Sequence, residues 1–230
     1  MTAYLLRILV YVVLPLVLGA VHVHLDRGAR TRERRLEILL LYLLGIGVGA
    51  NGIGGFSGHL FASDRVAEAI GWPAGNPFQL EVGFANLALG VLGVIAIHRR
   101  DGLREATVIA ATIFSVGATI VHVMDILATG NLAPGNTVQN VSNLARPALL
   151  IAFLVASRRA DKEGEPTLHP SEFEQWRVPR ANLVAWITGG VAMGFGIGLA
   201  LEQGLLGALL GLAGGAAAAW GVSGLRARSA

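Results

Sequence analysis

The chain has 230 residues, of which 53% are hydrophobic and 14% are charged, and its mean hydropathy is +0.60. A soluble domain has about 25% charged residues, so this composition excludes a soluble enzyme, a nucleic-acid-binding module and a disordered tail. The absence of cysteine excludes disulfides, thiolate nucleophiles and cysteine-ligated metals. Uncharged runs as long as a bilayer is thick predict an all-α integral membrane protein.

Seven stretches are long and apolar enough to cross a membrane as helices. A helix needs about 20 mostly apolar residues to cross the hydrocarbon core. The predicted spans are residues 4–23, 38–56, 78–97, 107–127, 138–157, 181–201 and 205–224. We therefore expect one transmembrane domain over residues 1–230, a bundle of seven helices whose last two form a hairpin.

The positions of the cations predict the orientation of these spans. Fifteen of the 18 Lys and Arg residues follow the first, third and fifth spans or lie in the tail. Because cytoplasmic loops carry an excess of Lys and Arg, the N-terminus is predicted outside and the C-terminus in the cytoplasm. Residues 158–180 then form a cytoplasmic polar loop. The net charge of +3 reflects this bias and indicates no nucleic-acid partner.

The outer connection over residues 57–77 combines a short helix with a stiff turn. Residues 63–70 have the pattern of an amphipathic helix capped by Ser63, which we expect at the membrane interface beside Trp72. Asn76 and Pro77 suit the N-cap and the first position of the third span. The third span is therefore predicted to have a defined start.

Glycines recur at four-residue spacing in the last two predicted spans, and such spacing lets helices approach closely in lipid. The positions are Gly190, Gly194 and Gly198, followed by Gly207, Gly211 and Gly215. They indicate either a homo-oligomer interface or the packing of the two hairpin helices on each other. The short turn at residues 202–204 favours the second interpretation.

Polar and ionisable residues inside three predicted spans mark a candidate binding pocket, because such groups are costly in a membrane. They all lie toward the outer face. The candidate pocket residues are Glu81, Asn86, His122, Asp125, Asn140, Asn143 and Arg146. An arginine at mid-membrane costs about 2.5–3.5 kcal/mol on insertion scales. We therefore expect Arg146 to form an ion pair with Asp125 or Glu81.

The charges of these residues predict a proton or cation as the ligand. Glu81, Asp125 and Arg146 leave a surplus negative charge when His122 is neutral, which a proton, a metal ion or a cationic solute would balance. His122, Asp125 and Glu81 suit a divalent metal such as zinc, manganese or iron. A protonated carboxyl or a charged His122 would balance the pocket without a metal.

A catalytic alternative comes from Gly55-Phe56-Ser57-Gly58, which resembles the nucleophile motif of rhomboid intramembrane proteases. His122 on another helix is the candidate base. The match covers four residues in a glycine-rich span, where it can arise by chance.

The segment GWPAGNPFQLEVGFANL, residues 71–87, resembles the signature of an uncharacterised bacterial family of small multi-pass membrane proteins, a domain of unknown function. The likeness is clear over residues 61–97 and looser through the fourth and fifth spans. It implies a multi-pass protein of the bacterial cytoplasmic membrane and assigns no site residues.

These observations favour a protein of the lipid bilayer that binds or transports a small solute, proton or cation through an outward-facing pocket. A membrane-embedded enzyme, either metal-dependent or a serine hydrolase, and an accessory or structural subunit are the alternatives.

Overall fold

The computed structural model describes residues 2–26, 31–163, 184–191, 194, 207 and 209–218, and all regular structure in these segments is helical. Two segments, η1 and η2, are π-helical and continue directly into α-helix on both sides. The elements are α1 (Thr2–Ile8), η1 (Leu9–Val13), α2 (Leu14–Leu25), α3 (Arg32–Tyr42), η2 (Leu43–Ala50), α4 (Asn51–Phe61), α5 (Ser63–Ile70), α6 (Phe78–Ala96), α7 (Gly102–Thr129), α8 (Pro134–Thr137) and α9 (Gln139–Glu163).

Five continuous helical rods are long and apolar enough to cross a membrane. They are Ala3–Leu25, Arg32–Phe61, Phe78–Ala96, Gly102–Thr129 and Pro134–Ala160. These rods coincide with the first five predicted spans and mostly extend beyond them. The sixth and seventh predicted spans fall largely outside the described residues, where only residues 184–191, 194, 207 and 209–218 are described. The seven-span topology and its orientation therefore stay predictions.

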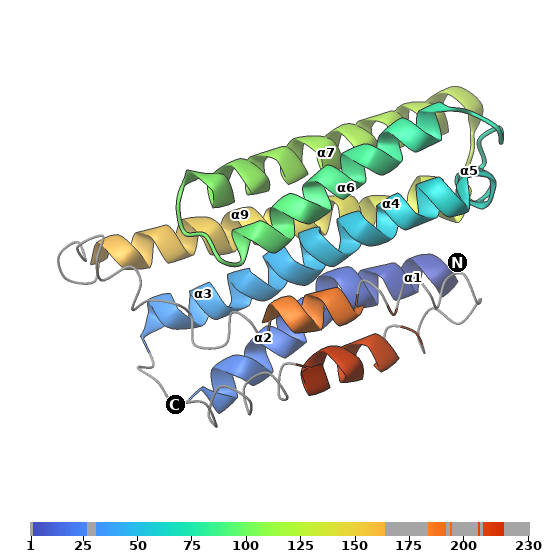
Figure 1. Cartoon of the computed structure of the whole chain (residues 1–230). Helices are drawn as coiled ribbons and strands as arrows, with labels where there is room; N and C mark the ends of the chain where they lie inside the picture. Colours follow the sequence, from blue (N-terminus) through green and yellow to red (C-terminus); the bar gives the residue numbers. More distant parts are fainter. Residues whose placement is uncertain are drawn as a thin grey trace.

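The rod formed by α3, η2 and α4 lies at the centre of the bundle, between α1–α2 on one side and α6–α7 on the other (Figure 1). Leu40, Leu43 and Leu44 on this rod have no exposed surface. A helix that is apolar on all sides needs neighbours on all sides, and this one has them. The central rod therefore touches every other layer of the bundle.

The glycines of the second predicted span allow two helix backbones to touch. A Cβ atom on Gly52 of α4 would lie 2.5 Å from the nitrogen of Gly90 on α6, and a Cβ atom on Gly93 would lie 2.6 Å from the nitrogen of Gly49. Backbone atoms at such distances cannot move aside for a side chain. The small residues thus bring α4 and α6 into direct contact, as small residues do between membrane helices.

The two helical pieces near the C-terminus, orange and red in Figure 1, pack on each other through the predicted glycine pattern. Cβ atoms on Gly190 and Gly194 would overlap the carbonyl oxygens of Gly211 and Gly207, respectively. Val184, Ile187 and Val191 belong to the buried core together with residues of η1, α3 and η2. The described glycines therefore contact one another within one chain, whereas Gly198 lies outside the described residues. A homo-oligomer contact stays a prediction.

The connections differ in detail from the sequence-based expectation. The short helix α5 spans Ser63–Ile70, but its N-cap is Ala62 and no side chain caps it, so Ser63 is the first helical residue rather than the cap. Asn76 Oδ1 accepts a hydrogen bond of 2.9 Å from the Phe78 amide, but the N-cap of α6 is Pro77, so Pro77 precedes the helix rather than occupying its first position. The first residues of the predicted polar loop, 158–163, continue α9, and residues 164–180 lie outside the described segments.

Candidate functional site

Arg146 lies near the middle of the fifth rod and is only 6% exposed. Its guanidinium group donates three hydrogen bonds to uncharged oxygens. Nε bonds the Ser142 carbonyl at 3.1 Å, Nη1 bonds the Gly47 carbonyl of η2 at 3.2 Å, and Nη2 bonds Asn143 Oδ1 at 3.2 Å. No carboxylate of the described chain pairs with it. Arg146 is therefore a buried cation whose hydrogen-bond partners in the described chain are all uncharged carbonyl and amide oxygens.

A cavity of about 150 Å³ lies beside Arg146 and is lined by residues from all five rods and from α5 and α8. The lining contains no aspartate and no glutamate. Its polar members are Tyr4, Arg7, Tyr11, Asn51, His59, Asn86, Ser115, Gln139, Asn143 and Arg146. The cavity belongs to the half of the bundle that holds the N-terminus, α5 and α8, which the orientation above predicts to be the outer half (Figure 1).

Arg7 adds a second positive charge to this cavity. Its guanidinium carbon lies 5.2 Å from the centre of the Tyr4 ring, in a cation–π contact. No carboxylate of the described segments pairs with Arg7 either. Two arginines without a counter-ion among the described residues thus line one cavity, and in a low-dielectric bundle such charges attract an anion strongly.

Asn143 and Gln139 extend the set of hydrogen-bond donors along α9. Asn143 Oδ1 accepts from both Arg146 Nη2 and Gln139 Nε2, the latter at 3.2 Å. Because two donors fix the oxygen of this amide, its Nδ2 group remains for a ligand. Gln139, Asn143 and Arg146 are spaced by four and three residues, so they share one face of α9.

The two π-helical segments pack against each other beside Arg146. η1 carries Tyr11 one turn beyond Arg7, and η2 supplies the Gly47 carbonyl that Arg146 bonds. A Cβ atom on Gly47 would lie 3.3 Å from the Tyr11 carbonyl, so the segments pack backbone to backbone. Such π-turns are rare and frequently occur at functional sites.

Asp125 lies in a different network, which ties the α5–α6 and α7–α8 connections and α8 to α7. Its Oδ2 accepts from Trp72 Nε1 at 3.0 Å and from the side-chain amides of Asn131 and Asn136, each at 2.8 Å. His122 Nδ1 is 2.8 Å from Asn136 Oδ1, and the Trp72 ring stacks on His122 with ring centres 5.2 Å apart. Neutral donors therefore stabilise Asp125, and the expected ion pair between Asp125 and Arg146 does not form.

Of the other predicted pocket residues, one lines the cavity and two lie outside it. Asn86 lines the cavity and bonds the Val82 carbonyl of its own helix at 2.9 Å. Asn140 bonds the Asn136 carbonyl at 3.0 Å and is not part of the lining. Glu81 is exposed on α6, so it does not pair with Arg146.

The proposed charge balance therefore does not hold, because the two acids and Arg146 do not share a cavity. Glu81 also does not join His122 and Asp125. Within the described segments, no three His, Asp or Glu side chains gather closely enough to hold a metal ion. The metal set of His122, Asp125 and Glu81 is thus not assembled.

The serine motif does not form a nucleophile and base either. The Ser57 hydroxyl donates to the Ile53 carbonyl of its own helix at 2.9 Å. His122 belongs to the network around Asp125 and bonds Asn136 instead. A catalytic serine needs a base within hydrogen-bonding distance, and the described residues place none there.

The predicted pocket omitted seven of the polar residues that line the cavity: Tyr4, Arg7, Tyr11, Asn51, His59, Ser115 and Gln139. Signals for some of them exist in the sequence. Arg7 is an ionisable residue inside the first predicted span, and Gln139 falls on the same helical face as Asn143 and Arg146. His59 has no such signal, because its partner Gln79 is 20 residues away.

A family model described as a family of unknown function (DUF6790) matches residues 6–163. The chain belongs to this family. No curated protein and no solved structure matches the chain. The DUF6790 segment includes every residue that lines the cavity except Tyr4, whereas the helical pieces after residue 183 lie beyond it.

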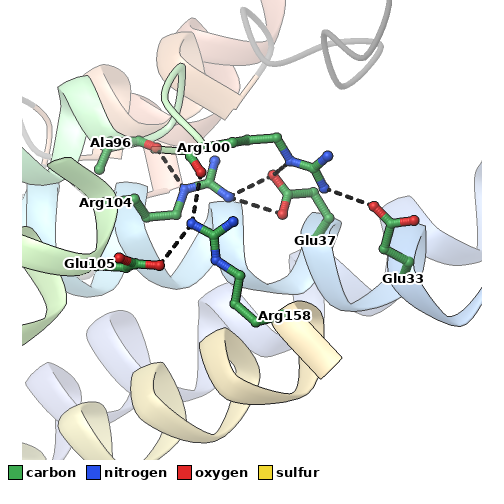
Figure 2. A network of polar contacts seen from close by, with 7 residues as sticks. All are labelled: Glu33, Glu37, Ala96, Arg100, Arg104, Glu105 and Arg158. Carbon is green, nitrogen blue, oxygen red and sulfur yellow. Dashed lines mark hydrogen bonds and ion pairs between the residues drawn. The ribbon is translucent and has the colours of Figure 1, made fainter. Parts of the chain in front are cut away.

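The DUF6790 segment also contains a buried ionic network at the opposite end of the bundle, shown in Figure 2. Glu37 of α3 accepts hydrogen bonds of 2.8 and 2.9 Å from Arg104 Nη1 of α7, and Arg100 Nε lies 3.1 Å from the same carboxylate. Arg100 also contacts Glu33, and Arg158 of α9 contacts Glu105 and the Arg100 carbonyl. The network joins α3, α7 and α9 and is separate from the cavity.

Proposed function

We propose that this DUF6790 protein binds a small anion within its helix bundle, in the cavity beside Arg146. The observation that carries the proposal is the pair Arg146 and Arg7, two cations that face one cavity with no carboxylate in its lining. A buried charge needs a partner to offset the loss of hydration. An anion from solution would supply that partner, and the donors left on Arg146 and Asn143 would bind its oxygens.

The size of the cavity limits the ligand to a few heavy atoms. A dry cavity of about 150 Å³ can take up a molecule as large as benzene. Pockets for drug-sized ligands are larger, about 300–1,000 Å³. Chloride, nitrate and small monocarboxylates such as acetate therefore suit the space, whereas sugar acids and nucleotides exceed it.

The location supports a role in solute uptake or sensing across a membrane. Arg146 sits near the middle of a rod long enough to span the bilayer, and intramembrane charges commonly mark solute or ion pathways. The sequence alone favoured a proton or cation. The positive charge of the cavity favours an anion instead, because the two acids on which the expectation of a cation rested lie outside the cavity.

The test is a binding titration of the full-length protein in lipid nanodiscs with sodium chloride, nitrate and acetate. Ionic strength is balanced with sodium gluconate, an anion too large for the cavity. We expect at least one of the three anions to bind, and Arg146→Gln to weaken its binding about tenfold to hundredfold, since hydrogen bonds to charged groups contribute about 1.5–3 kcal/mol. Arg146→Lys tests whether a positive charge is sufficient for anion binding without the planar, bidentate donors of a guanidinium group.

Arg158→Gln is the matched control, because Arg158 lies on the same helix α9 but contacts Glu105 far from the cavity. It should bind the anion like the unmodified protein. If a folded unmodified protein binds none of the three anions, the proposal is wrong. Arg146 would then serve helix packing, as the alternative of an accessory or structural subunit requires.

A further inference from the structure

His59 of α4 has one ring nitrogen fixed by a neutral partner, and the other has no partner among the described residues. Its Nδ1 lies 2.6 Å from Gln79 Oε1 at the start of α6. An amide oxygen only accepts hydrogen bonds, so the Nδ1 atom carries the hydrogen. Nε2 of a neutral His59 is then an acceptor, and no described residue bonds it. Because His59 lines the cavity, this lone pair is a proton-binding position in the same cavity as the two arginines.

No other group of the cavity competes with His59 for a proton near neutral pH. The first rod contributes Tyr4, Arg7 and Tyr11, and α9 contributes Arg146. The lining residues of α5, α6, α7 and α8 do not titrate, and Gln79 is neutral. The acids nearest in sequence, Asp64, Glu68 and Glu81, are exposed and outside the lining. Histidine is the side chain whose ordinary pKa, about 6.5, lies in the physiological range.

We propose that His59 takes up a proton together with the anion, so that the cavity binds an anion and a proton as a pair. In the empty cavity a third positive charge, added to those of Arg7 and Arg146, is unfavourable. A bound anion removes that penalty. The proton comes from water and binds Nε2. The imidazolium then donates through Nδ1 to Gln79, and its charge adds to the attraction of the cavity for the anion.

This inference rests on the proposed function and adds the coupled proton to it. Coupling between two ligands is reciprocal: if the anion favours protonation, protonation favours the anion by the same factor. Anion affinity should therefore rise as the pH falls through the titration of His59, by up to about tenfold per pH unit. A transporter built on this site would move the anion with a proton and would be driven by a proton gradient.

The test is calorimetric titration of the full-length protein in nanodiscs with sodium nitrate between about pH 5.5 and 7.5, a range that brackets the histidine pKa. Nitrate remains ionised throughout, so every proton taken up binds the protein. Repeating the titration in buffers of different ionisation enthalpy gives the number of protons taken up per nitrate. If chloride or acetate is the anion that binds, it replaces nitrate, with acetate titrated near pH 7.

We expect proton uptake by the unmodified protein and by His98→Gln, a control histidine that is exposed and outside the cavity lining. His59→Gln should bind nitrate without proton uptake and with an affinity independent of pH, and His59→Asn replaces it if the first variant does not fold. Binding without proton uptake in the unmodified protein, or uptake that survives in His59→Gln, would overturn the coupling and leave anion binding intact. Absence of binding by all three anions would instead refute the proposed function.

Discussion

The buried ionic network around Glu37 gives a quantitative prediction that is independent of the cavity. The Glu37 side chain is 2% exposed and the Arg104 side chain is 4% exposed, so both charges have lost nearly all their water. When the carboxylate is removed, Arg104 keeps the Ala96 carbonyl, at 3.2 Å from its Nε, as a hydrogen-bond partner. Replacing Glu37 by methionine therefore leaves a buried guanidinium without an anion (Figure 2).

Removing one partner of a buried pair costs about 3–5 kcal/mol, so we expect Glu37→Met to lower the free energy of unfolding by about that amount. Arg104→Met should cost less, about 2–3 kcal/mol, because Glu37 retains Arg100. The double variant should be more stable than the sum of the two losses implies, by about 2 kcal/mol, since it leaves neither charge without its partner.

The assay is equilibrium unfolding of the full-length protein in mixed micelles, followed by far-ultraviolet circular dichroism. Arg99→Met is the control, because the Arg99–Asp101 pair is exposed to solvent and should contribute nothing measurable. If the losses of the two single variants simply add in the double variant, Glu37 and Arg104 are not energetically coupled and the reasoning is refuted.

Three further substitutions test the packing of the bundle and the hydrogen-bond network around Asp125 in the same assay. Gly90→Ala would place a Cβ atom 2.8 Å from the Ile53 nitrogen, so it should lower the free energy of unfolding by about 1–3 kcal/mol. Its control is Gly117→Ala, whose Cβ atom meets nothing within 4 Å and which should raise the free energy of unfolding by up to about 1 kcal/mol; equal effects would contradict the close contact of α4 and α6. Asn136→Ala should cost about 2–3 kcal/mol, because Asn136 is fully buried and bonds Asp125; a loss below about 0.5 kcal/mol would show that the network around Asp125 is not a stabilising element.

Part of the candidate site could be predicted from single residues. Arg146 and Asn143 stand out in the sequence because polar groups are expensive within an apolar span, and both line the cavity. Their partners could not be predicted. Asp125 or Glu81 was predicted to pair with Arg146, but Asp125 accepts hydrogen bonds from Trp72, Asn131 and Asn136 instead. Neutral donors at the right distance serve a carboxylate as well as a cation does, and sequence spacing does not reveal them.

The amino-acid sequence by itself determined that this chain consists of apolar helices of membrane-spanning length, and it located five of them. The reason is local: in lipid each backbone polar group must be bonded within its own segment, so hydropathy over about 20 residues is sufficient to recognise a span. The tertiary structure decided how each helix is rotated about its axis and where the π-turns of η1 and η2 fall. Those two features set which side chains share a cavity. Sequence alone does not reveal either feature, because both depend on contacts between residues far apart in the chain, such as Arg146 with Gly47 and His59 with Gln79.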